Sequence, residues 1–190
     1  MVSLGQYAWL LRLWRRLDQF SELVNRLAIA LIAVLLSVMT AVVLLQVFRR
    51  YVLNSALIWP EELSLMLMTW ITFAGVSVGV RRGDHVAVEY FRSKLPARAA
   101  QFVTLLWHAV MIAMMLVFTA VTWKVTLLTR DIRSDAMQVS LIWPKLALPV
   151  GGALAILQLL SLLVADFITI LSGIPSTDLL RPDNAATGGE

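Results

Sequence analysis

Four long apolar segments dominate the chain, and none of them contains Asp, Glu, Lys or Arg. They run from Leu27 to Phe48, from Leu63 to Val80, from Ala99 to Trp123 and from Leu146 to Ala165. Each is close to the roughly 20 residues that a helix needs to cross the hydrocarbon of a bilayer. The pattern therefore predicts an all-α integral membrane protein with four transmembrane helices, at residues 27–48, 60–80, 97–128 and 144–166.

Two shorter segments are amphipathic. Apolar residues recur at helical spacing from Trp9 to Leu27, and most of the neighbouring arginines lie off that stripe. This spacing is typical of a helix that lies in the membrane interface, so we expect an N-terminal interfacial amphipathic helix. A short amphipathic connector is expected at 85–95, between the second and third crossings. Residues 1–175 would then form a single membrane domain, and the tail at 176–190, which contains Pro and Gly, is expected to be disordered.

The composition and charge of the chain also indicate a membrane protein. Only 15% of the 190 residues are charged and 59% are hydrophobic, whereas about 25% of residues are charged in soluble domains. The net charge of +4 does not indicate nucleic-acid binding, because the Lys and Arg residues flank the apolar segments, where they set orientation in the lipid bilayer.

The cations are unevenly divided between the two sides of the predicted membrane. Ten fall on the side of the termini and six on the other, so the positive-inside rule predicts a multi-pass protein with N- and C-termini in the cytoplasm. Trp59, Trp123 and Trp143 would lie at the outer interface, where indole rings favour the headgroup level.

The second crossing has unequal polar ends, with Glu61-Glu62 before it and Arg81-Arg82 after it. The carboxylates would fall in the first helical turn after Pro60, where the positive end of the helix dipole stabilises negative charge. A second hypothesis pairs Glu61 or Glu62 with Arg49 or Arg50 at the end of the first helix. Both explanations can hold together.

Three rows of small residues have the spacing that lets transmembrane helices approach closely. They are Ala33, Ser37 and Ala41 in the first crossing, Gly75 and Gly79 in the second, and Gly151 and Ala155 in the fourth. We expect packing within the four-helix unit to explain most of these positions. Helices that carry little chemistry of their own nevertheless suggest a subunit of a larger complex.

The threonines between Thr119 and Thr129 share one face of the third helix. Three explanations are open for them: bonds from their hydroxyls to the helix backbone, packing on a neighbouring helix, or contact with a partner.

The chain offers little catalytic or metal-binding chemistry. It has no cysteine and two histidines. A bis-histidine haem needs ligands at matching depth, whereas His85 falls in the connector and His108 inside the third crossing. We expect His108 to be neutral and bonded to Thr104 or to a neighbouring helix, and Asp84 to cap the connector. We assign no catalytic, substrate-binding or metal-binding residue and expect neither a cofactor in this chain nor enzyme activity.

Between residues 49 and 96 several short elements occur in a specific order and spacing. They are Arg50-Tyr51, Trp59 with Glu61-Glu62, Trp70 and Gly75, Arg81-Arg82, His85-Val86 and Leu95-Pro96. In this order they resemble the small membrane subunit (the Q, or DctQ-like, component) of tripartite ATP-independent periplasmic transporters, called TRAP transporters. We interpret Trp59, Glu61, Glu62, Arg81, Arg82, Asp84 and His85 as architectural positions.

The resemblance implies a scaffold subunit rather than the carrier itself. The chain would pair with a large M subunit that holds the substrate and sodium sites and moves in an elevator fashion, while a soluble periplasmic binding protein delivers the solute. Uptake would be a sodium-coupled symport of an organic acid or similar solute across a bacterial or archaeal inner membrane. The alternative function is a cytochrome b-like membrane anchor of a redox enzyme, which would bind haem through His108.

The small subunit would also present an outer surface to the binding protein. The candidate docking residues, chosen because the predicted topology exposes them outside, are Arg49, Arg50, Glu61, Arg130, Asp131, Arg133 and Asp135. Ordinary solvated loop charge is the competing explanation for each of them.

Overall fold

The computed structural model describes residues 8–82 and 96–172. The predicted connector at 85–95, with Asp84 and His85, and the predicted disordered tail at 176–190 lie outside the described residues.

The described part of the chain forms α1 (Ala8–Tyr51), α2 (Trp59–Arg82), α4 (Ala97–Leu128), α5 (Ile142–Lys145) and α6 (Ala147–Ser172). α1, α2, α4 and the segment formed by α5 and α6 are each long and apolar enough to cross a membrane. The predicted fold class is therefore confirmed: the protein is all-α, with four segments that can span a bilayer.

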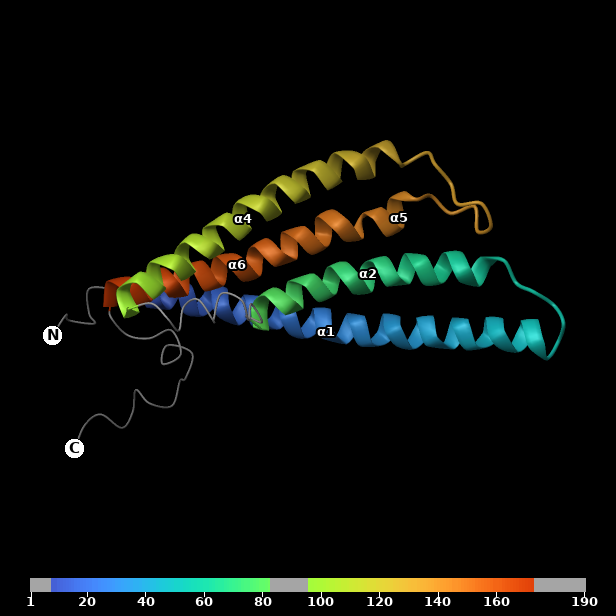
Figure 1. The fold of residues 1–190 in the computed structure, drawn as a ribbon, viewed down its shortest axis with the longest axis horizontal. Coiled ribbons are helices and arrows are strands. Elements are labelled where there is room, and N and C mark those ends of the chain that lie inside the picture. Colours follow the sequence, from blue (N-terminus) through green and yellow to red (C-terminus); the bar gives the residue numbers. More distant parts are fainter. Residues whose placement is uncertain (1–7, 83–95, 173–190) are drawn as a thin grey trace, which may run out of the picture.

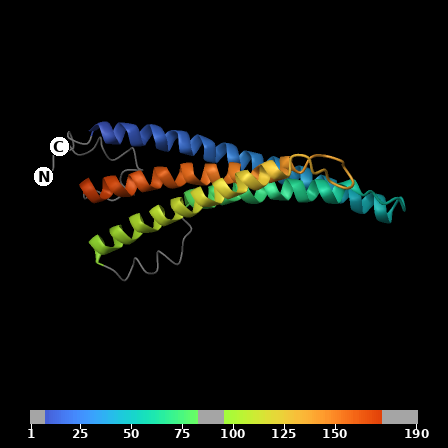
Figure 2. The same cartoon turned by 90° about the horizontal axis from the view of Figure 1, so that it is seen from above.

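Helix α6 lies at the centre of the arrangement. It packs along both α4 and α2, while α1 packs along α2 and along a shorter length of α6. Consecutive long helices run in opposite directions, so that the start of α1 and the end of α6 lie at one end of the molecule (Figure 1). We call this the terminal end. The opposite end, where residues 52–58 and 129–141 link the helices, is called the loop end. Figure 2 shows α1 and α4 on opposite sides of α6 toward the terminal end.

Helix α1 is a single helix of 44 residues, so the separate interfacial helix expected from Trp9 to Leu27 is not found. The predicted apolar stripe is not the face that packs on α6, since Leu13, Phe20 and Leu27 are all more than 50% exposed. The packed face is a neighbouring one: Trp14 is 3% exposed, and its indole Nε1 donates a hydrogen bond to the carbonyl of Ser161 over 3.3 Å. The exposed apolar stripe is therefore left to face lipid as part of a continuous helix.

Two prolines shape the loop end of the fourth segment. Pro144 lies in the short helix α5, near its start, where a missing N–H costs little. Pro149 has no N–H and so cannot donate a hydrogen bond to the carbonyl of Lys145, one turn back. That carbonyl instead accepts a hydrogen bond from the hydroxyl of Thr126 over 3.1 Å. The proline therefore leaves free an acceptor that ties α4 to α5.

Helix α6 approaches both of its long neighbours closely at two adjacent glycines. A Cβ on Gly151 would lie 2.6 Å from the carbonyl oxygen of Phe73 in α2, and a Cβ on Gly152 would collide with the hydroxyl of Thr119 in α4. At the same level the rings of Phe73 and Phe118 stack, with centroids 5.8 Å apart. The absence of side chains at these two positions lets three helices meet.

Candidate interaction surfaces

The loop at residues 129–141 folds back on itself at the loop end. The backbone N–H of Ser134 donates to the carbonyl of Val139 over 2.9 Å, and an antiparallel bridge joins Arg133 to Ser140. These bonds give the loop a defined shape although it forms no regular strand pair.

Glu62, in the first turn of α2, holds this loop. Its carboxylate accepts the backbone N–H of Ala136 over 2.7 Å and that of Met137 over 2.9 Å. Hydrogen bonds with an ionised partner are roughly twice as strong as neutral ones. The start of α2 and the α4–α5 loop are therefore joined into one surface.

The predicted pairing of Glu61-Glu62 with Arg49-Arg50 is wrong. Arg49 donates from Nη2 to the hydroxyl of Ser55 over 3.1 Å, and the guanidinium of Arg50 lies 5.6 Å from the ring centroid of the next residue. Both arginines contact residues at or just after the end of α1. The carboxylate of Glu62 accepts hydrogen bonds from backbone N–H groups, an interaction that no sequence pattern reveals.

The seven candidate docking residues all belong to segments at the loop end. Arg49 is half-buried, and the six exposed residues are Arg50, Glu61, Arg130, Asp131, Arg133 and Asp135. A groove of about 540 Å³ lies between the first turns of α2 and the loop. Its charged lining residues are Glu62, Arg133, Asp135 and Lys145. Both signs of charge are thus presented at this end around a concave surface.

The Gly75–Gly79 row of α2 is uncovered in the part of the chain that the structure describes. A Cβ added at either glycine would meet no atom within 4 Å, in contrast to Gly151 on α6. Thr72 and Val76, which share this side of α2, are also exposed. We expected packing within the four-helix unit to explain most of the small residues, and this expectation is wrong for the Gly75–Gly79 row. Helix α2 packs on α6 through a different face.

The row on α1 is uncovered as well, whereas the row on α6 is buried. Ala33, Ser37 and Ala41 are all exposed, and the hydroxyl of Ser37 bonds back to the carbonyl of Ala33 over 2.8 Å. Ala155 has no exposed surface and packs in a cluster with Val80 and Leu159. Of the three predicted rows, the described chain uses the α6 row for its own packing.

His108 joins α4 to α6. Its Nδ1 lies 2.5 Å from a carboxylate oxygen of Asp166, and the two side chains are 12% and 16% exposed. Thr104 instead donates to the carbonyl of Ala100 over 3.0 Å, so the partner is the neighbouring helix and not Thr104. Within the described ranges, no group of three or more His, Asp or Glu residues is placed to hold a metal ion.

The threonine face of α4 packs inside the protein. Thr122, Thr126 and Thr129 are at most 8% exposed, and their hydroxyls donate to α4 carbonyls one turn back. Two of the alternatives weighed for these residues therefore hold together, bonding to the helix backbone and packing on a neighbour, since Thr126 also donates to the carbonyl of Lys145 in α5. These three side chains are not left to face a partner.

Sequence reasoning missed a polar cluster at the terminal end. The Nη2 atom of Arg81 lies 2.9 Å from the carboxylate of Asp18, and its Nε lies 3.2 Å from that of Glu22. Asp18 also accepts the hydroxyl of Ser161 over 3.1 Å. A signal was available, because Trp14, Asp18 and Ser21 recur at the spacing of one helix face.

Comparison with known proteins identifies relatives over most of the chain. Residues 39–169 match the family described as "Tripartite ATP-independent periplasmic transporters, DctQ component". The chain is 22% identical over 161 residues to the sialic acid TRAP transporter small permease protein SiaQ of Vibrio cholerae, covering 85% of this chain and 92% of the relative.

Two further relatives match over shorter stretches. The C4-dicarboxylate TRAP transporter small permease protein DctQ of Vibrio cholerae is 27% identical over 109 residues, which cover 57% of this chain and 46% of the relative. The sialic acid TRAP transporter permease protein SiaT of Haemophilus influenzae is 33% identical over 61 residues, which cover 32% of this chain but 10% of that much longer protein.

Proposed function

Because the chain belongs to the DctQ component family of tripartite ATP-independent periplasmic (TRAP) transporters, we propose that it is the static scaffold that holds the large permease subunit in the membrane and helps to dock the periplasmic binding protein. At the coarser level the assignment is plain: it is a TRAP transporter small permease subunit, and it associates with the large subunit.

The uncovered Gly75–Gly79 row carries the scaffold proposal. Glycines at this spacing let two transmembrane helix backbones come close enough for extensive van der Waals contact. No residue of the described chain occupies the space above them, so the space is open to a helix of the large subunit. The SiaT relative supports this association, since a segment similar to this chain forms part of a longer permease protein.

The docking proposal rests on the loop end. Glu62 fixes the 129–141 loop to α2, and the exposed charges of that loop surround the groove of about 540 Å³. A surface whose shape is set before binding loses less conformational entropy on association. The proposed orientation, based on the uneven distribution of Lys and Arg, puts both termini in the cytoplasm and this end in the periplasm, where the binding protein would approach.

The transport proposal is the sodium-coupled uptake of an organic acid, with the solute and sodium sites in the large subunit. The names of two relatives, one for sialic acid and one for C4-dicarboxylates, refer to carboxylate-bearing solutes. The chain itself contributes anchoring surface, and in its described part the partly buried side chains of Arg81 and Asp18, and of His108 and Asp166, are engaged in contacts between its own helices.

Co-purification of the tagged chain with the large subunit tests the scaffold role. Changing both Gly75 and Gly79 to Leu should fill the open space and lower the yield of large subunit. Ala153→Leu is a matched control, because Ala153 is exposed on α6 away from this row. Undiminished co-purification of the double variant would show that the large subunit binds elsewhere.

A further inference from the structure

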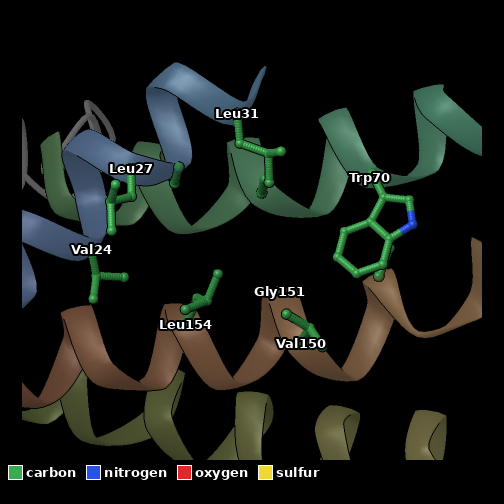
Figure 3. A pocket seen from close by; sticks show the side chains of 10 residues that line it. Val24, Leu27, Leu31, Trp70, Val150, Gly151 and Leu154 are labelled. Carbon is green, nitrogen blue, oxygen red and sulfur yellow. The ribbon is translucent and has the colours of Figure 1, made fainter. Parts of the chain in front are cut away.

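An apolar cavity lies between α1, α2 and α6, away from the surfaces assigned above. It has a volume of about 300 Å³, and its walls include Leu27 and Leu31 of α1, Trp70 and Ala74 of α2, and Val150 and Leu154 of α6. Figure 3 shows these walls, with α1 and α6 on either side of the space and the indole of Trp70 closing it toward the loop end. Every lining side chain is apolar except for the indole N–H of Trp70.

Two hydrogen-bonded contacts join the helices at the two ends of this space. Toward the terminal end, the hydroxyl of Ser21 bonds to the side-chain oxygen of Gln158, whose Nε2 donates to the carbonyl of Ser21 over 3.1 Å. Toward the loop end, Trp70 Nε1 donates to the carbonyl of Trp143 over 3.2 Å. Between the two contacts small residues such as Ala28 line the walls and leave the space unfilled.

The surroundings of the cavity limit what can fill it. Its lining belongs to helices that span the membrane, and water finds no hydrogen-bond partners against apolar walls. Gly79 follows Trp70 by nine positions, about two and a half helical turns. The large subunit that we place on the glycine row would therefore lie on the other side of α2, which leaves the cavity to lipid.

We propose that this cavity binds one acyl chain of a membrane phospholipid. Its α1 wall is the single helix face formed by Val24, Leu27, Ala28 and Leu31. From Val24 to Leu31 the cavity follows α1 for about 10 Å, along the axis of a membrane-spanning helix and therefore in the direction in which an acyl chain runs.

Photo-crosslinking of the complete membrane complex tests the proposal. A phospholipid with a diazirine in its acyl chain is reconstituted with the small and large subunits, loosely held lipid is washed away with detergent, and cross-linked peptides are mapped. We expect retained label on the α1 and α6 segments that line the cavity. Ala28→Leu fills part of the space and should lower this label about tenfold relative to label on the exposed surface of α1.

Matched variants separate filling of the cavity from misfolding. Leu154→Phe fills the same space from α6, while Ala30→Leu and Ala153→Leu add the same bulk as Ala28→Leu at exposed positions of α1 and α6 and should leave the label unchanged. Equal label in Ala28→Leu, Leu154→Phe and the unchanged protein would overturn the site. Label that appears without the large subunit and vanishes with it would assign the cavity to a side chain of that partner.

Discussion

The guanidinium of Arg81, at the end of α2, lies 2.9 Å from the carboxylate of Asp18 in α1. The same guanidinium donates to Glu22 and to the hydroxyl of Ser21, and its side chain is 14% exposed. The basic residue that would orient α2 in the membrane is thus also the residue that ties α2 to α1.

Removing this cation should destabilise the terminal end. In Arg81→Met the carboxylate of Asp18 loses its charged partner and that of Glu22 keeps only Arg26. The cluster is partly buried, so we expect the free energy of unfolding to fall by about 2 kcal/mol. Unfolding of the detergent-solubilised chain measures it. Arg82→Met is the control, since Arg82 is exposed, and equal losses in the two variants would refute the role given to Arg81.

The glycines of α6 and α2 should respond differently to a methyl group. Gly151→Ala forces its Cβ against a backbone carbonyl of α2, which cannot move without shifting the helix, so we expect a loss of about 1–3 kcal/mol in the purified chain. Gly75→Ala enters open space and should leave the stability of the isolated chain unchanged or raise it by up to about 1 kcal/mol. Thermal unfolding in detergent compares the two. A larger loss for Gly75→Ala would contradict the packing described.

The contact between α6 and α4 predicts a rescue. In Gly152→Ala the new Cβ collides with the Thr119 hydroxyl, but its distance to the Thr119 Cβ is an ordinary 3.5 Å. Adding Thr119→Ala should therefore recover most of the stability, because the hydroxyl removed has no hydrogen-bond partner. Double-mutant analysis of unfolding measures the coupling, and additive losses would argue against this contact.

Loss of the Glu62 carboxylate should loosen the loop at residues 129–141. In Glu62→Ala the backbone N–H groups of Ala136 and Met137 lose their acceptor, and we expect their hydrogen exchange to become about tenfold faster. Glu61→Ala is the matched control, since its exposed carboxylate lies next in sequence. If both variants leave exchange in the loop unaltered, the loop is held by its internal bonds instead.

Charge at the loop end should affect solute uptake through docking. Reversing Arg130 and Arg133 together, both exposed, should weaken association with the binding protein and lower uptake most at low ionic strength, where steering by charge is strongest. The paired change Arg12→Glu with Arg15→Glu at the terminal end serves as control for net charge. Normal uptake by the Arg130 and Arg133 variant, with the complex intact, would remove these residues from the docking surface.

The hydropathy and length of individual segments were sufficient to predict the helical membrane crossings. Hydropathy and length are properties of contiguous segments, so the four spans could be predicted, and the motif between residues 49 and 96 was enough to identify the family that the comparisons then matched. The rows of small residues could also be located, because their spacing is that of a helix.

The tertiary structure alone decided what those elements do. Whether a glycine packs or stays open depends on which helix faces meet, and that separates Gly151 from Gly75 although both belong to small-residue rows. Glu62 turned to the backbone of a loop and not to Arg49, because a carboxylate takes the donors that the fold brings within reach. The run of apolar residues in each segment was enough to predict the membrane crossings, since burial in hydrocarbon acts on each helix separately. Only the assembled helices determined which faces, charges and cavities remain for partners and lipid.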